Sequence, residues 1–193
     1  MKPGTLRIVV LVAAIGLIVL LYSLPRQSST KRMAVGSQEV ELSSEISQAI
    51  DMVATGTNPM GGIQMLLTMV EEDSTNVEAH FWLGKFSVQS GQFEKAEVRF
   101  QTVTRLDPTN VDGWWELASS QFQQKRYAEA LEGFIETRKL DATFDNALFF
   151  QGQCYQLMGD SSKAIETYQA FLPLVKDTVV VGWLHNTINE LKD

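Results

Sequence analysis

The stretch NVEAHFWLGKFSVQSGQFEKAEVRFQTVTRLDPT, residues 76–109, is followed directly by NVDGWWELASSQFQQKRYAEALEGFIETRKLDAT, residues 110–143. The two 34-residue segments differ at most positions but share a set of small and large apolar residues. That set recurs as Leu83/Leu117, Gly84/Ala118, Ala96/Ala130, Phe100/Phe134 and Leu106/Leu140, and it continues with Gly152, Tyr155, Ala164, Tyr168 and Leu174. An internal repeat of this period predicts a stack of similar structural units.

Each segment has the pattern of two helices. Its apolar residues are three and four positions apart, which is the spacing of an amphipathic helix. Gly91 and Gly159 lie midway through their segments, where a left-handed residue ends the first helix. Lys125 has this position in the second segment, which predicts some loss of stability there. Pro108 follows the second helix of the first segment and ends it.

The segments resemble the tetratricopeptide repeat, whose pattern is W-x2-L-G-x2-Y…A-x3-F…P. The matches are Leu83, Gly84, Ala96, Phe100 and Pro108 in the first unit; Trp114, Leu117, Ala118, Ala130 and Phe134 in the second; and Gly152, Tyr155, Ala164 and Tyr168 in the third. His80, Ala142 and Gln151 depart from the pattern, which has Trp, Pro and Leu at these positions. The resemblance implies an all-α solenoid, in which stacked hairpins bury apolar faces that no hairpin buries alone.

The repeat register predicts the domain organisation. Three clear repeats are expected at 77–110, 111–144 and 145–176, after a degenerate helical pair at 37–76 and before a capping helix at 177–193. Asn58 and Pro59 have the residue types of an N-cap and a first helical position. Asp177 is the predicted N-cap of the last helix, and Trp183 is expected to anchor that helix on the third repeat.

The N-terminal part of the chain has a different composition. An uncharged apolar run extends over seventeen residues from Ile8 to Leu24, which is close to the length that spans a bilayer. It predicts a short basic tail over 1–7, a transmembrane signal anchor over 8–25 and a flexible linker over 26–36. A cleaved secretory signal is the alternative, but the stretch LYSLPRQ, residues 21–27, holds no Ala-x-Ala-like pair for cleavage.

The orientation of this anchor is less strongly specified. Lys2 and Arg7 on one side nearly balance Arg26, Lys31 and Arg32 on the other, so the positive-inside rule alone does not decide it. The short tail favours an N-terminus inside the cell. We therefore expect a single-pass protein of a bacterial inner membrane with its repeats facing the periplasm.

Charge and motifs argue against several classes of function. Of the 16 basic residues, five precede residue 33, which leaves 11 basic against 23 acidic residues in the remainder. A domain of that charge binds phosphate backbones poorly, so no nucleic acid partner is expected. The sequence has no HExxH, CxxC or GxSxG motif, His80 and His185 are isolated, and Cys154 is the single cysteine. We expect no enzymatic activity, no cofactor and no metal site.

The resemblance also implies a binding groove on the concave face of the solenoid, lined by the first helix of each unit at its second, fifth, ninth, twelfth and thirteenth positions. The predicted partner-binding residues are Phe81, Lys85, Val88, Trp115, Ser119, Phe122, Phe149 and Gln153. Only Lys85 among them is charged, which disfavours the clamp that some family members use for a peptide's carboxylate. An apolar or amphipathic partner segment fits better. A second interpretation of Phe81, Trp115 and Phe149 is that they pack between units.

These features predict a non-enzymatic adaptor or assembly factor that holds a protein or peptide partner near a membrane. The arrangement is similar to that of bacterial inner-membrane repeat proteins that assist the maturation of exported proteins. Two alternatives stay open. One is a structural subunit permanently docked in a membrane complex, and the other is a cytoplasm-facing receptor of the organelle-import kind.

Overall fold

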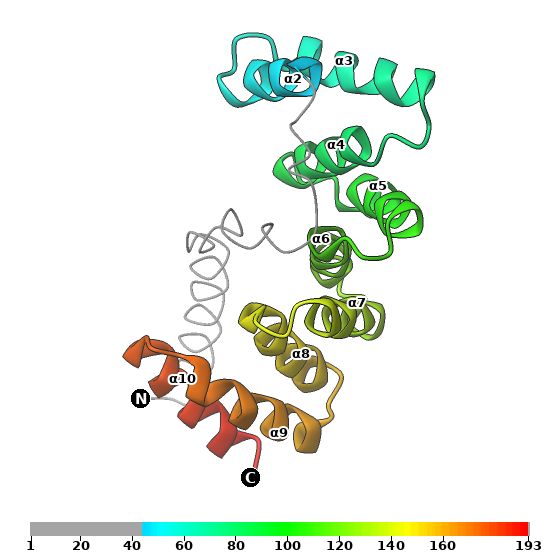
Figure 1. Cartoon of the computed structure of the whole chain (residues 1–193). Helices are drawn as coiled ribbons and strands as arrows, with labels where there is room; N and C mark the ends of the chain where they lie inside the picture. Colours follow the sequence, from blue (N-terminus) through cyan, green and yellow to red (C-terminus); the bar gives the residue numbers. More distant parts are fainter. Residues whose placement is uncertain (1–43, 193) are drawn as a thin grey trace. The chain divides into compact units, whose positions relative to one another are not determined.

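The computed structural model describes residues 44–192, and the elements in this range are helices. They are α2 (Ser44–Ala54), α3 (Pro59–Glu72), α4 (Val77–Gln89), α5 (Phe93–Leu106), α6 (Val111–Gln123), α7 (Tyr127–Leu140), α8 (Asp145–Leu157), α9 (Ser161–Phe171), the short 3-10 helix η2 (Leu172–Leu174) and α10 (Thr178–Glu190). Consecutive helices follow one another along a single stack (Figure 1). The predicted helical solenoid is confirmed for this part of the chain.

The predicted tail, anchor and linker, residues 1–36, lie outside the described residues. Within residues 44–192, no helix has both the length and the apolar character that a membrane crossing needs.

The helices repeat at the interval of the sequence. The first helices α4, α6 and α8 have 13 residues each and begin at positions 77, 111 and 145. The second helices α3, α5 and α7 have 14 residues each and begin at positions 59, 93 and 127. We call the pairs α4–α5, α6–α7 and α8–α9 units 1, 2 and 3. Helices α2 and α3 form an N-terminal pair, and α10 follows in the place of a further first helix.

Each unit turns through the same hydrogen-bonded motif. Gly91 and Gly159 have φ angles of 71° and 82°, and Lys125 adopts the same left-handed conformation at 61°. The amide that follows each of them donates to the carbonyl five residues earlier, as from Gln92 to Ser87 at 2.8 Å. This is the Schellman arrangement, which satisfies the last carbonyls of the first helix. Lys125 therefore has the left-handed conformation that disfavours a residue with a Cβ atom, in a turn that keeps the same hydrogen bonds, and the loss of stability there stays a prediction.

The turns between units rest on an Asp-x-Thr sequence. Asp107 accepts hydrogen bonds from the amide and the hydroxyl of Thr109, at 3.0 and 2.7 Å, and the same bonds recur 34 residues before and after. Asn110 follows as the N-cap of α6 and accepts from the amide of Gly113 at 2.8 Å. The repeated Leu-Asp dipeptide of the sequence thus ends one unit, and the asparagine begins the next.

The two helices of a unit meet at a small residue of the first helix. A Cβ atom added at Gly84 would lie 2.7 Å from Cε1 and Cζ of Phe100. At Gly152 it would lie 2.5 Å from Cε1 of Tyr168. Both rings are completely buried, so neither has space to move aside. Glycine is therefore required by a close approach of helices, as the spacing of small and large residues predicted.

In unit 2 the close approach of the two helices depends on a different pair of small residues. Its first helix has Ala118 where units 1 and 3 have glycine, and the facing residue of α7 is Gly133. A Cβ atom at Gly133 would lie 2.8 Å from that of Ala118. The corresponding residues of the other second helices are Arg99 and Thr167. The methyl group gained on one helix is thus balanced by a side chain absent from the other.

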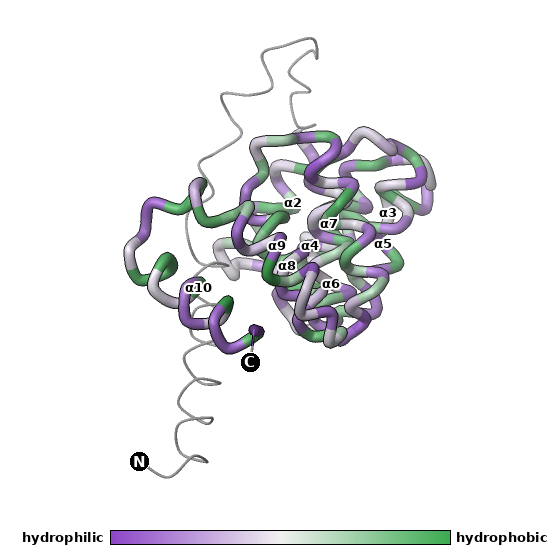
Figure 2. The backbone as a smooth tube through the Cα atoms, turned by 90° about the horizontal axis from the view of Figure 1, so that it is seen from below, coloured by the Kyte–Doolittle hydropathy of each residue, from purple (hydrophilic) through white to green (hydrophobic). Residues whose placement is uncertain are grey.

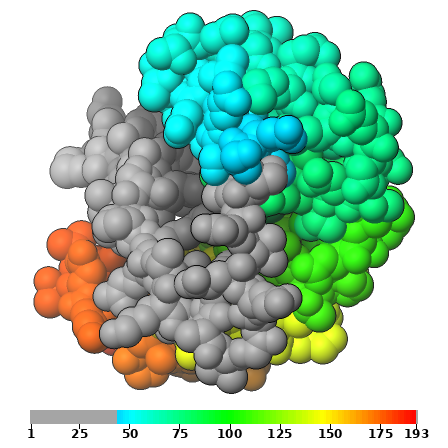
Figure 3. All heavy atoms as spheres, turned by 45° about the horizontal axis from the view of Figure 1, so that its top comes forward, coloured from blue at the N-terminus to red at the C-terminus, as the bar shows by residue number. Residues whose placement is uncertain are grey.

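The core continues between units and reaches the last helix. Phe134 of α7 stacks on Phe150 of α8, with 5.3 Å between ring centroids. Asp177 caps α10 through the amides of Val179 and Val180, and Trp183 packs on Phe149 at 5.7 Å, as predicted. Apolar and polar residues alternate along the helices in Figure 2. The N-terminal end of the stack, formed by α2 and α3, is toward the viewer in Figure 3.

A methyl group placed at the helix contact will destabilise the protein. We expect Gly84→Ala to lower the free energy of unfolding by about 1–3 kcal/mol, because the new Cβ overlaps the buried Phe100 ring. Gly182→Ala is the matched control, since nothing lies within 4 Å of a Cβ at this position of α10. It should raise the same free energy by about 0.5–1 kcal/mol through helix propensity. Urea denaturation of both variants measures the difference, and equal effects would contradict the packing argument.

Candidate protein-binding surface

The first helices form the row on which the binding residues were predicted. Helix α4 contacts the first helices on both sides of it, α2 and α6, as well as its own second helix. The second, fifth, ninth and twelfth positions of a first helix are separated by three, four and three residues. They therefore lie along one side of the helix. We call this side of α4, α6 and α8 the inner stripe.

The structure places Trp115 and Phe149 in the core. Trp115 is 3% exposed, and its ring lies 4.9 Å from Phe144, 5.3 Å from Phe134 and 5.5 Å from Phe150. Phe149 is 1% exposed and packs against Trp183. Of the two interpretations of these aromatics, packing between units therefore describes both residues. Contact of either ring with a partner is still a prediction, and little of their surface is open to one.

The other apolar residues of the predicted surface are either buried or half-buried. Phe122 of α6 is also buried, and its ring lies 5.3 Å from that of Phe150. Phe81 and Val88 of α4 are only half-buried, although both pack against the cluster around Phe100. The apolar groups that a partner can reach on the inner stripe are therefore concentrated on α4.

Lys85, the charged residue of the predicted surface, is held in an ion pair. Its Nζ atom donates to Oε1 of Glu116 at 2.7 Å, across the boundary between units 1 and 2. The Lys85 side chain is 26% exposed and that of Glu116 5%. The sequence argument missed this pair because Glu116 occupies a position that it did not assign to the groove.

The ninth positions of units 2 and 3 are polar and buried. Ser119 and Gln153 are each less than one-tenth exposed. Within the described part of the chain, Ser119 Oγ and Gln153 Oε1 have no hydrogen-bond partner. Such atoms are costly to bury unpaired. A hydrogen-bond donor from outside residues 44–192 would relieve that cost.

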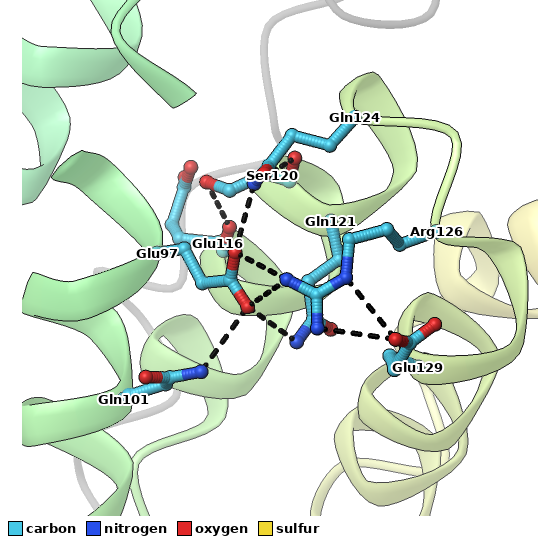
Figure 4. Close-up of polar contacts among 8 residues, drawn as sticks. All are labelled: Glu97, Gln101, Glu116, Ser120, Gln121, Gln124, Arg126 and Glu129. Atoms are coloured by element: carbon cyan, nitrogen blue, oxygen red, sulfur yellow. Dashed lines mark hydrogen bonds and ion pairs between the residues drawn. The ribbon is translucent and has the colours of Figure 1, made fainter. Parts of the chain in front are cut away.

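A second ionic cluster lies on the second-helix side of the same boundary (Figure 4). Glu97 of α5 is buried, and Nη1 of Arg126 donates to its two carboxylate oxygens at 2.7 and 2.8 Å. The amides of Gln101, Gln121 and Gln124 also donate to this carboxylate. The cluster joins units 1 and 2, and the strained Lys125 immediately precedes the arginine. No repeat position signals it in the sequence.

His80 is a packing residue with two hydrogen bonds. Its Nδ1 lies 3.2 Å from Nη1 of Arg99, and its Nε2 lies 3.1 Å from the carbonyl of Ser74. A guanidinium only donates, so Nδ1 accepts and Nε2–H donates to the carbonyl. The ring is therefore neutral. Burial lowers its pKa, and the nearby positive charge of Arg99 acts in the same direction.

Cys154 and the acidic residues offer no site for chemistry. Cys154 is completely buried, and burial raises the pKa of its thiol to about 12, so the thiolate is disfavoured. Residues 44–192 contain no group of histidine, cysteine, aspartate and glutamate side chains that could hold a metal ion.

Models of the tetratricopeptide repeat match residues 83–137 and 146–172. Among curated proteins, the chain is 24% identical over 133 residues to Superkiller complex protein 3 of Mus musculus, a match that covers 68% of this chain and 8% of that protein. It is 27% identical over 117 residues to Stress-induced-phosphoprotein 1 of Caenorhabditis elegans, covering 57% of this chain and 37% of that one. The matched region is thus a minor part of both relatives.

Solved structures of MamA have a similar fold. One superposes with a TM-score of 0.66 at 21% identity and covers 78% of this chain and 87% of that one. A second gives 0.64 at 19% identity, with 79% and 94% covered. At these identities the likeness concerns the fold alone.

Removing the Trp115 ring will test whether it packs or binds. We expect Trp115→Ala to lower the free energy of unfolding by about 3–5 kcal/mol, because three neighbouring rings lose their contact and a cavity remains. Thermal and urea denaturation measure the loss. Unchanged stability combined with weaker partner binding would assign this ring to recognition instead.

The neutral form of His80 predicts a dependence of stability on pH. Because the folded pKa lies below the unfolded value of 6.5, the stabilisation is complete above that value and is lost as the pH falls toward the folded pKa. Urea denaturation between about pH 5 and pH 8 should show this loss in the unmodified chain. His80→Phe keeps an aromatic ring without the titration, so its curve should be flatter. Identical pH profiles for the two proteins would contradict the assignment.

Proposed function

Because the chain belongs to the tetratricopeptide repeat family, a family of non-catalytic protein-interaction scaffolds, we propose that it is an adaptor or assembly factor for a protein partner. It acts beside a membrane, to which the apolar segment 8–25 tethers it. The partner segment lies along the inner stripe.

The observation that supports this proposal is that apolar side chains of the inner stripe are partly exposed on α4. Phe81 and Val88 offer half-buried apolar surface there, while the rings further along the stripe are engaged with one another. Lys85 is held by Glu116, so the one lysine predicted to line this surface is already paired and is not free to bind a terminal carboxylate. The surface therefore suits an internal, apolar or amphipathic segment of a partner.

The proposed location is a bacterial inner membrane, crossed once, with the repeats in the periplasm. The length of the apolar run and the absence of a cleavage site support the tether. The short basic tail before the run supports this orientation. The tether would keep the inner stripe close to membrane-bound or newly exported partners.

A permanently docked structural subunit is the second candidate. The buried oxygens of Ser119 and Gln153, which have no hydrogen-bond partner within residues 44–192, favour it, because a surface that is always covered need not satisfy its polar groups alone. An import-type receptor facing the cytoplasm is a third possibility and needs the opposite orientation of the anchor.

Partner capture with matched variants tests the proposal. The full chain is extracted from its own membrane in mild detergent, and co-purifying proteins are quantified by mass spectrometry. We expect Val88→Gln to reduce the recovery of specific partners about tenfold, since it places an amide on the inner stripe. Val98→Gln is the control, because Val98 is 61% exposed on the second helix α5. It should leave recovery unchanged.

The outcomes separate the candidates. Failure of the unmodified chain to retain any specific protein would refute the adaptor function. A fixed stoichiometric set, resistant to both substitutions, would favour the docked subunit. The same preparation reports the mature N-terminus, which must precede Ile8 if the anchor is retained. Labelling of Ser29→Cys in intact cells reports the side of the membrane, and the buried Cys154 keeps the background low.

A further inference from the structure

The ninth position of the first helices holds a polar side chain in each unit. Lys85, Ser119 and Gln153 occupy it in α4, α6 and α8, and Thr187 lies a further 34 residues along, in α10. Lys85 is engaged in its bond to Glu116. The side chains of Ser119, Gln153 and Thr187 are buried. The inner stripe and its continuation on α10 thus carry a column of polar groups that are shielded from bulk water.

Two of these groups make no hydrogen bond in the part of the chain that the structure describes. Ser119 and Gln153 are 4% and 6% exposed, and Ser119 Oγ and Gln153 Oε1 have no partner there. The adjacent Ser120 is also buried, but its Oγ donates to the carbonyl of Glu116 at 2.8 Å. A serine of α6 can therefore satisfy its hydroxyl on the preceding turn of the helix, and Ser119 does not do so.

The two oxygens destabilise the free chain and favour a bound one. A buried polar atom without a partner loses its bonds to water and gains none in exchange. Folded proteins retain few such atoms. A ligand that supplies the missing donors removes this penalty, and the bonds form in a dry environment, where hydrogen bonds are strong.

The chemistry of Ser119 and Gln153 fits the main chain of a polypeptide. A glutamine amide and a serine hydroxyl can each accept and donate. A peptide group offers the reciprocal N–H and C=O. In a helical partner these groups are already bonded along the helix. A segment in the polyproline II conformation has no internal hydrogen bonds and leaves them free.

The spacing of the column agrees with this conformation. Packed helices lie about 8–10 Å apart, and neighbouring first helices such as α4 and α6 contact each other. A polyproline II segment has three residues per turn with a rise of about 3.1 Å, so equivalent peptide groups recur about every 9 Å on one side. One peptide group can therefore meet Ser119 while the group one turn further along meets Gln153.

We propose that Ser119 and Gln153 bind the main chain of an extended partner segment in a conformation like polyproline II. Gln153 Oε1 accepts from one N–H group of the segment, and Ser119 Oγ accepts from another one turn away. Apolar side chains of the segment pack on Phe81 and Val88. This inference rests on the proposed adaptor function and names the conformation and the groups that the adaptor recognises.

A matched pair of serine variants tests whether the Ser119 hydroxyl lacks a partner in the free chain. Ser119→Ala and Ser120→Ala make the same change at adjacent buried positions of α6, so the gain in helix propensity is the same. Only Ser120→Ala removes a hydrogen bond to residues 44–192. We expect Ser119→Ala to melt about 2–4 °C above Ser120→Ala. Equal melting temperatures would show that the Ser119 hydroxyl is already satisfied and would overturn the inference.

Matched synthetic peptides test binding to the full chain in non-ionic detergent. The probe is a fluorescein-labelled peptide of about 12 residues built from Pro-Leu-Ser repeats, whose prolines favour the polyproline II conformation. The comparison peptide carries a methyl group on the backbone nitrogen of every leucine and serine, which removes its N–H donors. Fluorescence anisotropy measures both affinities, with protein-free micelles as the blank. We expect the unmethylated peptide to bind at least about tenfold more tightly.

Two variants locate the effect on the inner stripe. Ser119→Ala/Gln153→Met should reduce the preference for the unmethylated peptide to within about threefold, because both oxygens are removed. Ser120→Ala is the control and should keep the full preference, since the Ser120 hydroxyl is bonded within its own helix. Melting curves of both variants verify that the fold is intact.

Three binding results would overturn the inference. The first is equal binding of the two peptides, or no binding of the unmethylated peptide. The second is an unchanged preference in Ser119→Ala/Gln153→Met. The third is concentration-dependent self-association of the chain that this variant abolishes, which would assign the column to a second copy. If partner capture still depends on Val88 in these cases, the adaptor function stands and only the recognition of a main chain fails.

Discussion

The structure depends on how closely the two helices of a unit approach each other. In unit 1 the ring of Phe100 occupies the volume that a side chain at position 84 would need. In unit 3 the ring of Tyr168 does the same above Gly152. This contact brings the helices together and buries the ring completely, which fixes the position of each second helix. The next first helix then packs against a surface that is already determined.

Neighbouring units are joined by different means at the two boundaries. Between units 1 and 2 the polar links are the Lys85–Glu116 pair on one side and the Glu97–Arg126 pair on the other. Between units 2 and 3 the contact is mainly aromatic, with Trp115 surrounded by rings of α7, α8 and the turn between them, and a partly exposed ion pair joins Arg138 to Asp145 at 3.1 Å. The same 34-residue repeat therefore supports both an ionic and an aromatic interface.

Phe144 illustrates how the aromatic boundary replaces local capping. Units 1 and 2 begin with Asn76 and Asn110, whose side chains accept from amides of the first turn. At the same place unit 3 has Phe144, which makes no side-chain cap. Its ring instead lies 4.9 Å from that of Trp115. The hydrogen bond lost at the helix terminus is offset in part by the contact of this half-buried ring with Trp115.

Much of the fold could be predicted because it depends on local spacing. The 34-residue period predicted the helical hairpins, Gly91 and Gly159 marked left-handed turns, and Asp177 marked an N-cap; all of these are found. The surface was harder to predict, because burial of an aromatic such as Trp115 depends on which rings the adjacent unit supplies. The position of Phe81 in the repeat is identical, yet its ring is only half-buried.

The ionic contacts were not predictable from the repeat for a related reason. Lys85 and Glu116 are 31 residues apart, and Glu97 and Arg126 are 29 apart, so neither pair follows the 34-residue register. They become neighbours only when the units are stacked. A tally of charge along each helix would have indicated an acidic first-helix row, but it would not have shown which acid is already paired.

The two boundaries also differ in how much of the inner stripe they leave accessible. A buried carboxylate is unfavourable unless donors surround it, and removing one partner of such a pair is strongly destabilising. Glu97 and Glu116 therefore hold units 1 and 2 in one arrangement without filling the inner stripe with rings. Apolar and acidic groups near this boundary stay partly accessible. At the aromatic boundary between units 2 and 3, the apolar side chains are buried against one another. The inner stripe thus has one part whose side chains are used in packing between units and another part whose side chains stay partly accessible.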